Sequence, residues 1–373
     1  MLEITWQAVV CYTGSVIAMH RTKQLVVALG VGVVLLVLGG CALFQQTCAE
    51  ITVDRMSGTV PLTIQFSGSE SCGAGGIDTF HWTFGTGDES YETGGTYTYQ
   101  HAGEYTLTLS VRSGNGTMRT ESMKINVLPA LWVTDENLDR IYKLDMNGQE
   151  ILSFPAPAAE PRGIASAVLG GTQWLYVACQ GEGIQRLYRV DPSDGSVASE
   201  YGAPAQSPVQ LAYGADEPER LWHTDALSRK IYELNPNSGA VLGSFGTNYF
   251  RSSRQVGDEI FLQTPQGLAW TERVGGAGYL HYLEGETHLL YEITIVPSYD
   301  LMAGMQLSIA GDPIEILADV FPVSGMAWLD GYLWVADRDR HRLVQIDPAT
   351  GLGTGQTISG FPGANIGGLD IQQ

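Results

Sequence analysis

Basic side chains are scarce in this sequence. Twenty Lys and Arg residues stand against forty Asp and Glu residues in 373, which gives a formal net charge of -20. Because such a surface repels phosphate backbones and anionic headgroups, the composition argues against nucleic-acid binding. Helix-favouring runs of Ala, Glu, Lys and Leu are also rare, whereas Gly is abundant at 46 and short segments rich in Tyr, Trp, Val and Thr alternate with turn residues. This pattern predicts an all-β protein.

Recognisable catalytic and metal-binding motifs are missing as well. The seven His residues show no metal-ligand spacing, and no Cys pair lies beside them in the sequence. A Gly-x-Ser-x-Gly nucleophile motif is absent. The sequence therefore predicts neither a cofactor nor a set of catalytic residues, and it favours a non-enzymatic function while leaving an enzyme open.

A hydrophobic run long enough to cross a bilayer comfortably is absent, but a shorter one lies near the N-terminus. The apolar residues 25–38 follow a basic stretch at residues 19–23. A run of about fourteen residues after basic residues is typical of a secretory signal peptide. We predict the signal over residues 19–40 and interpret residues 1–18 as preceding the true start at Met19.

The signal ends in Leu38-Gly39-Gly40-Cys41, which resembles the lipobox of bacterial lipoproteins. In that family small residues precede a cysteine that is diacylated and becomes the new N-terminus. The resemblance implies that Cys41 is lipidated, that residues 41–49 form a tether, and that the protein is anchored in the bacterial cell envelope outside the cytoplasm. More than one acyl chain gives stable membrane attachment. Ala42 after the anchor favours the outer membrane over the inner one.

Three cysteines follow the predicted anchor. Because disulfides persist in oxidising compartments, the cysteines of an exported protein can be expected to form them. Cys48 and Cys72 are candidates for a disulfide that ties the start of the first domain to its first loop, with two free thiols as the alternative. Cys179 has no obvious partner and lies in an apolar strand pattern.

Residues 50–128 contain short segments in which apolar and polar residues alternate. Turn residues such as 85–88 and 113–116 separate these segments. A period of two places one apolar face inward, which predicts a β-sandwich. We expect Trp82 and Phe84 in its core.

This region resembles the PKD family. The resemblance rests on the residues 58–63, 66–68, 82–87 and 99–107. It implies an immunoglobulin-like sandwich that acts as a spacer or interaction module. Thr83 and Thr86 stand where the family usually has Asp, so ion binding at that turn is not expected.

Residues 129–373 are self-similar. A segment that opens with Leu and an aromatic residue recurs five times, with His281 replacing the aromatic once, and each is followed by a partner strand. A second signature also occurs five times, at residues 163–165, 210–212, 267–269, 325–327 and 368–370. The first hairpin lacks such a strand before it and the last such strand lacks a hairpin after it, so the two ends of this domain are expected to complete one blade together.

The repeats predict a β-propeller and resemble NHL and YVTN propellers. We expect five four-stranded blades, and the alternative is six, with a degenerate blade hidden in residues 244–266. The loops between the second and third strands of each blade surround the channel mouth in a propeller. Those loops cover residues 135–139, 180–183, 225–229, 284–287 and 337–341.

Two groups of residues are candidates for ligand binding at this mouth. Asp135, Asp225 and Asp337 occupy equivalent blade positions, where they either form a ring that holds a cation such as Ca²⁺ or fix hairpin turns by accepting backbone N–H groups. The second group begins the inner strands and comprises Arg162, Gln210, Gln266 and Ser324.

The combined features predict a membrane-anchored envelope lipoprotein whose propeller acts as a non-catalytic binding or scaffolding module for a protein or carbohydrate. The alternative is a propeller enzyme, because Gln266-Gly267-Leu268 and residues 333–337 resemble glutamine cyclotransferases, and calcium-dependent lactonase-type propellers are similar too. A purely structural envelope protein is a third interpretation.

Overall fold

The regular secondary structure of the described chain is almost entirely β-strand, as predicted for an all-β protein. The computed structural model describes residues 7–12, 15–20, 46–183, 185–215, 218–246, 250–251, 259–260, 265–273, 276–285, 287–297, 305–360 and 365–372. Besides strands they contain the short 3-10 helix η1 (Gly181–Gly183). None of the helices in these residues has the length and apolarity needed to span a membrane. The predicted anchor Cys41 and residues 21–40 lie outside the described residues.

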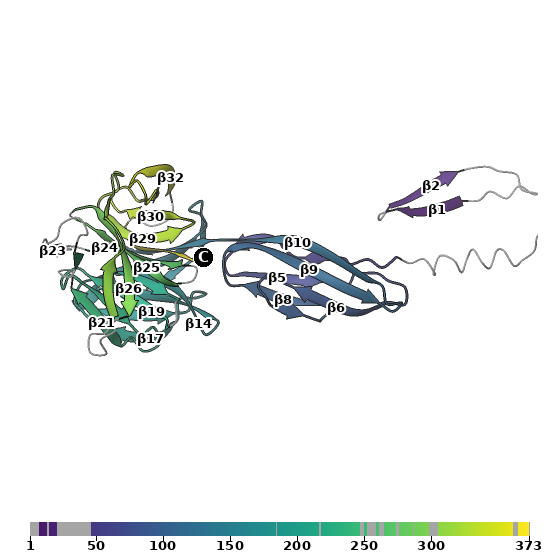
Figure 1. Ribbon diagram of the computed structural model, residues 1–373, viewed down its shortest axis with the longest axis horizontal. Helices are drawn as coiled ribbons and strands as arrows, with labels where there is room; N and C mark the ends of the chain where they lie inside the picture. Colours follow the sequence, from purple (N-terminus) through teal and green to yellow (C-terminus); the bar gives the residue numbers. More distant parts are fainter. Residues whose placement is uncertain are drawn as a thin grey trace, which may run out of the picture. The chain divides into compact units, whose positions relative to one another are not determined.

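The structure divides into two compact units, and the larger contains everything from Ile125 onward (Figure 1). A separate hairpin of β1 (Gln7–Tyr12) and β2 (Ser15–His20) lies at the N-terminal end of the sequence.

The sandwich predicted from alternation is present as two sheets. One has the order β4-β10-β9-β6-β7 and the other β3-β5-β8. The strands are β3 (Thr52–Val53), β4 (Ser57–Thr59), β5 (Leu62–Ser67), β6 (Ile77–Thr83), β7 (Glu89–Ser90), β8 (Gly94–Tyr99), β9 (Gly103–Ser113) and β10 (Met118–Leu128). Trp82 and Phe84 are buried as expected, and both rings pack edge-on against Phe66 at centroid distances of 4.8 and 5.2 Å.

Cys48 and Cys72 lie on neighbouring backbone segments and are joined by a disulfide, with their Cα atoms 5.0 Å apart. Each backbone N–H donates to the carbonyl of the other residue, at 2.8 and 3.1 Å. Cys179 is a buried free thiol, and burial raises its pKa to about 12.

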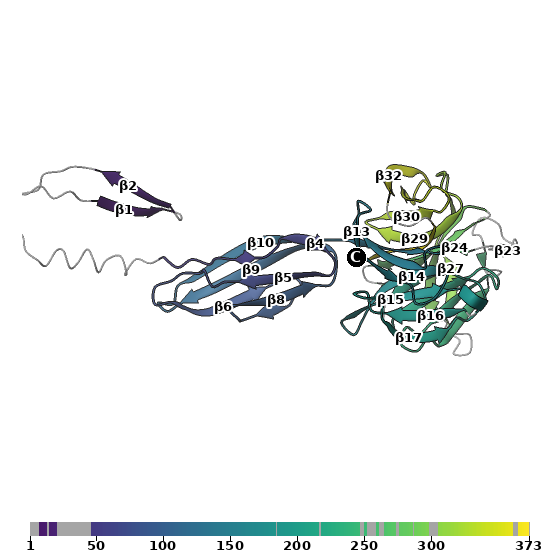
Figure 2. The same cartoon turned by 180° about the vertical axis from the view of Figure 1, so that it is seen from behind.

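The larger unit contains five sheets of propeller type. The first has the order β13-β12-β11-β33, and the others run β14 to β17, β18 to β21, β24 to β27 with β28 beside β26, and β29 to β32. Figure 2 shows β14 to β17 lying next to one another in this order.

Their bounds are β11 (Ala130–Asp135), β12 (Arg140–Leu144), β13 (Glu150–Pro155), β14 (Pro161–Leu169), β15 (Thr172–Cys179), β16 (Arg186–Val190), β17 (Val197–Gly202), β18 (Pro208–Gly214), β19 (Arg220–Asp225), β20 (Lys230–Leu234), β21 (Val241–Gly246), β24 (Pro265–Arg273), β25 (Gly276–Glu284), β26 (Leu289–Pro297), β27 (Met305–Ile309), β28 (Ile314–Glu315), β29 (Val323–Leu329), β30 (Tyr332–Asp337), β31 (Arg342–Ile346), β32 (Gly353–Ser359) and β33 (Ile366–Gln372). A small hairpin of β22 (Phe250–Arg251) and β23 (Glu259–Ile260) lies in the stretch between β21 and β24.

The last strand of the chain completes the first blade, as predicted. β33 pairs antiparallel with β11, from Ala130 opposite Gln372 to Asp135 opposite Ile366. The inner strands contact one another in the closed order β33, β14, β18, β24, β29 and back to β33. Five described sheets therefore surround one axis. The blade count of the whole chain stays a prediction, since much of the stretch between β21 and β24 lies outside the described residues.

Glycines allow the inner strands to pack closely around the axis. A Cβ atom on Gly163 would lie 2.9 Å from the Cα of Gln210, and one on Gly325 would lie 2.5 Å from the backbone nitrogen of Leu369. Contacts this short do not occur in close-packed interiors, so each position requires glycine. These glycines explain why the second sequence signature opens with Gly in four of its five copies.

Gln210 occupies the glycine position in the remaining inner strand. Its side chain is fully buried, and Nε2 donates a hydrogen bond of 2.8 Å to the carbonyl of Leu369. Leu369 lies on β33, which is not a neighbour of β18 in the ring, so the Gln210 side chain crosses the channel. It obstructs the channel at this level.

Gly325→Ala is expected to lower the free energy of unfolding by about 1–3 kcal/mol, because the added methyl group overlaps the backbone of β33. Gly202→Ala is the matched control, since a Cβ there meets no atom within 4 Å. Urea unfolding of both variants checks this expectation. Equal stability of the two variants would contradict the close packing of the inner ring.

Candidate functional site

The inner strands all become irregular at the same end of the ring. Register shifts occur between the first and third residues of β14, β18 and β24, between Val323 and Met326 on β29, and on β11 opposite the start of β33. Such bulges reorient side chains and are frequent beside binding sites. Arg162, Gln266 and Ser324 all lie within these bulges. Gln210, grouped with them in the sequence analysis, lies one residue further along its strand, inside the channel.

The second strand of each blade ends at the same end of the ring, where the inner strands begin. The final residues Asp135, Cys179, Asp225, Glu284 and Asp337 each pair with the first residue of an inner strand, and all are at most 1% exposed. Four of the five are carboxylates. In the second blade the buried Cys179 takes this place.

The three predicted Asp residues fix the turns that follow them. Oδ1 of Asp135 accepts the backbone N–H of Asn137 at 2.9 Å and of Leu138 at 3.0 Å. Asp225 accepts the N–H of Ser228 at 2.7 Å, and Asp337 accepts that of Arg340 at 3.2 Å.

These contacts match the turn-fixing interpretation rather than an open ring of carboxylates. Within the part of the chain that the structure describes, His, Cys, Asp and Glu side chains form no group of three that could hold a metal ion.

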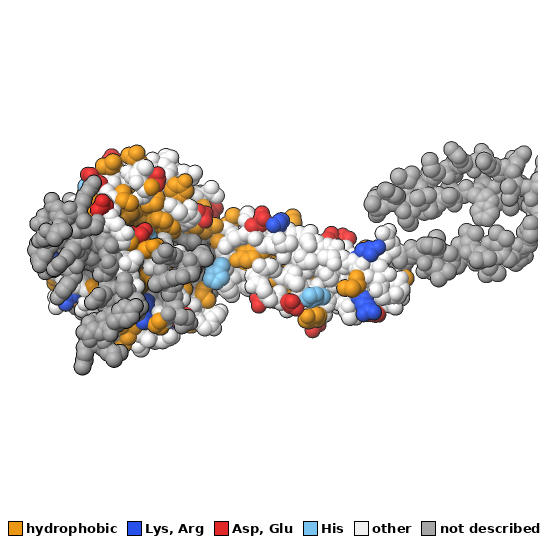
Figure 3. Space-filling view, viewed as in Figure 1, with side chains coloured by type: hydrophobic (Ala, Val, Ile, Leu, Met, Phe, Trp, Pro, Cys, Tyr) orange, Lys and Arg blue, Asp and Glu red, His pale blue; other side chains and the backbone are white. Residues whose placement is uncertain are grey.

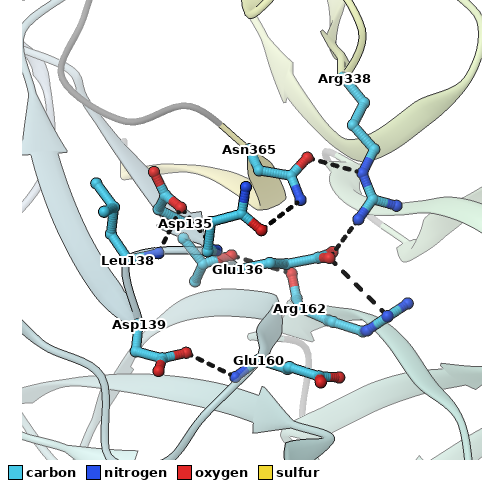
Figure 4. A network of polar contacts seen from close by, with 10 residues as sticks. Asp135, Glu136, Leu138, Asp139, Glu160, Arg162, Arg338 and Asn365 are labelled. Atoms are coloured by element: carbon cyan, nitrogen blue, oxygen red, sulfur yellow. Dashed lines mark hydrogen bonds and ion pairs between the residues drawn. The ribbon is translucent and has the colours of Figure 1, made fainter.

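An ion-pair network lies directly beyond these turns (Figure 4). The carboxylate of Glu136 in the first blade pairs with the guanidinium of Arg338 in the fifth blade and lies 3.9 Å from Nη2 of Arg162 in the second. The backbone N–H of Glu136 donates to the carbonyl of Asn365 at 2.9 Å, and Nε of Arg338 donates to Oδ1 of the same residue at 3.0 Å. Three consecutive blades therefore meet at one carboxylate.

The network is partly open to solvent. The side chain of Glu136 is 8% exposed, whereas those of Arg162 and Arg338 are 28% and 31% exposed. Burial raises the pKa of Glu136 above its ordinary value, although the two guanidiniums oppose this shift. Glu160 raises the pKa of Glu136 further, so two guanidiniums and two carboxylates gather here, in a chain whose net charge is strongly negative.

Several buried polar atoms at and below the mouth have no hydrogen-bond partner among the described residues. They are Nε of Arg162, Oε1 of Gln180, Oε1 of Gln210 and Oγ of Ser324. A buried polar atom without a partner costs about 1–3 kcal/mol, so such atoms favour the binding of a polar ligand or water. Gln266 differs, because its Oε1 accepts the backbone N–H of Val323 at 3.3 Å.

Sequence reasoning placed the correct loops on this rim but did not identify Glu136, Arg338 or Asn365. The signal that could have found the first two is their position, since each directly follows one of the equivalent Asp residues.

Comparisons with known proteins support the prediction made for the first domain. A family model of the PKD domain matches residues 48–127, which confirms the predicted PKD domain. Collagenase ColA of Clostridium perfringens (strain 13 / Type A) is 42% identical over 66 residues, which make up 17% of this chain and 6% of that protein. The chain thus matches only a small part of this curated relative.

Among solved structures, a chain of a nidogen/laminin complex has a TM-score of 0.45 at 14% identity, and the match covers 66% of this chain and 98% of that one. A streptogramin B lyase has a TM-score of 0.37 at 16% identity, with 78% and 91% covered. The resemblance to NHL and YVTN propellers stays a prediction.

Glu136→Gln is expected to change the pH dependence of stability. A carboxyl group whose pKa is raised on folding contributes stability below its unfolded pKa, near 4.5, and this contribution is lost as the pH rises through the folded pKa. The difference in free energy of unfolding, wild type minus variant, should therefore decrease with rising pH.

Urea unfolding at several pH values measures this difference. Glu150→Gln, which removes an exposed carboxyl group of the same blade that does not act on Glu136, is the control. A difference that increases with pH would contradict the expectation.

Proposed function

We propose that this chain is a bacterial envelope lipoprotein, anchored through Cys41, whose propeller binds a partner at the channel mouth without catalysis. The observation that carries the proposal is the network of Glu136, Arg162 and Arg338 at the end of a channel that Gln210 obstructs. A ligand is therefore held at the rim rather than passed through the ring.

The chemistry of the rim favours a partner that presents an acidic group. Guanidinium groups bind carboxylates with two parallel hydrogen bonds, and arginine is enriched at interfaces. The side chains of Arg162 and Arg338 are 28% and 31% exposed, and Nε of Arg162 has no partner in the part of the chain that the structure describes. A protein or an acidic carbohydrate fits this description.

The sequence of domains supports the envelope location. The lipobox-like residues 38–41 precede a tether and then a PKD domain, which is typical of a spacer between an anchor and a binding domain. Lipid attachment requires the export that also favours the disulfide of Cys48 and Cys72. Ala42 favours the outer membrane.

A propeller enzyme, similar to glutamine cyclotransferases or lactonases, is the second candidate. The raised pKa of Glu136 favours it, because general acids at active sites show such shifts. In the described residues, however, this carboxylate contacts two arginines and no second acid or base. The geometry therefore supports binding better than catalysis.

Capture experiments test the anchor and the mouth together. The wild-type chain, expressed in its own bacterium, is expected to sediment with membranes, and Cys41→Ser is expected to move to the soluble fraction. Soluble Cys41→Ser chain is then used as bait for solubilised envelope proteins and glycans. Arg162→Ala/Arg338→Ala should reduce capture of the bound partner about tenfold or more, because charged hydrogen bonds at the rim are lost.

Arg112→Ala/Arg119→Ala, which removes the same charge from exposed residues of the sandwich, is the matched control and should capture the partner normally. Equal capture by both double variants would contradict binding at the mouth. A wild-type chain in the soluble fraction would contradict the lipid anchor.

A further inference from the structure

A buried histidine lies below the mouth in the third blade. Two residues before the end of the second strand, the other four blades have Val133, Val177, Tyr282 and Val335. His223 occupies this place on β19, and its side chain is fully buried. A titratable side chain therefore replaces an apolar or aromatic one in this blade, and local exceptions of this kind are often functional.

The ring nitrogens of His223 are not held in place by the fold. In the described residues neither Nδ1 nor Nε2 makes a hydrogen bond of normal geometry. The ring lies beside that of Tyr232, at a centroid distance of 6.1 Å and an interplanar angle of 31°. Burial lowers the pKa of His223 to about 4, although Asp225 and the backbone of Gln210 oppose this shift. The ring is therefore neutral near pH 7 and gains a proton readily only where water reaches it.

One charged side chain acts on His223 among the described residues, and it is Asp225. Side chains alternate along β19, so His223 shares its face with Leu221 and Asp225. Leu221 belongs to the apolar cluster between the second and third blades. The titratable side chains of that cluster are Tyr176, Tyr201, Tyr213 and Tyr232. Because tyrosines stay neutral in acid, His223 and Asp225 determine the response of this interface to low pH.

Both neighbours of His223 hold the mouth turn of the third blade. Asp225 accepts the backbone N–H of Ser228 at 2.7 Å and that of Ser207 at 2.5 Å. The hydroxyl group of Tyr232 donates to Oγ of Ser228 at 3.1 Å. A movement of these two side chains that lets water reach His223 therefore also disturbs the turn.

We propose that this arrangement is an acid-sensitive switch at the mouth, in which protonation of His223 opens the turn of the third blade. A proton from solvent binds the ring when the turn opens, and the imidazolium then attracts the carboxylate of Asp225. This carboxylate leaves the N–H groups of Ser207 and Ser228, so the turn stays open. The switch does not depend on the proposed partner, because it operates in the free chain.

The pH window follows from the proton that is taken up on opening. An exposed histidine has an ordinary pKa of 6.5, and burial lowers the pKa of His223 to about 4 in the closed turn. The closed state therefore loses stability relative to the open state as the pH falls below about 6.5, and the loss levels off below about 4. The ratio of open to closed turns should rise about 20-fold between pH 7 and pH 5.

Hydrogen–deuterium exchange of the whole chain at pH 7 and pH 5 tests the switch, with each rate divided by the intrinsic rate at that pH. Protection of the amides of Ser207 and Ser228 should fall about 20-fold in wild type. The turns after Asp135 and Asp337 are internal controls, because a carboxylate also fixes them but valine replaces the histidine. Protection of their amides should change less than about threefold.

Substitutions identify the group that responds. His223→Phe keeps an aromatic ring of similar size and should remove the pH dependence, and His223→Gln tests the same point without a ring. The matched control His281→Phe removes a buried histidine of the fourth blade and should leave the response of the third blade intact. Constant protection in wild type, an equal fall in all three turns, or a fall that persists in the His223 variants would overturn the proposal.

Discussion

The pairing of β33 with β11 is the contact on which the rest of the larger unit depends. It joins residues more than 230 positions apart, from Ala130 opposite Gln372 to Asp135 opposite Ile366. Nε1 of Trp132 also donates to Oε1 of Gln372 at 3.1 Å. On the other side of β33, Asp370 accepts the backbone N–H of Ser166 on β14 at 2.7 Å. Closure in this way pairs the inner edge of β11 and gives the first blade four strands.

The candidate site exists only because the ring is closed. Glu136 meets Arg338 and Asn365 across the junction of the first and fifth blades, and it meets Arg162 across the junction with the second blade. The inner ring is too tightly packed to hold a ligand at the level where Gln210 reaches Leu369. The partner that we propose would therefore be held at the rim. Figure 3 shows acidic and hydrophobic side chains on the visible face of the larger unit.

The architecture could be predicted from the sequence because it depends on local, repeated patterns. Alternation predicted the sandwich strands, the two repeated signatures predicted the hairpins and inner strands, and an unmatched first hairpin predicted closure by the last strand. The candidate site at the channel mouth was harder to predict from the sequence. Glu136 and Arg338 lie 202 residues apart, and no local pattern indicates that their blades are neighbours. Gln210, grouped from the sequence with residues at the mouth, lies directly after the bulge of its strand and reaches the carbonyl of Leu369 inside the channel.

One irregularity of the repeat, the His residue at an aromatic position, could be interpreted only from the structure. His281 was evident as the exception to an aromatic position, but its stacking on Trp328 depends on the contact between the fourth and fifth blades.

Hydrogen–deuterium exchange of the intact chain tests ring closure most directly. If β33 pairs with β11 along its length, the amides of residues 366–372 exchange as slowly as those of the equivalent inner strand β29. Exchange as rapid as that of the exposed outer strand β32 would contradict the closed ring.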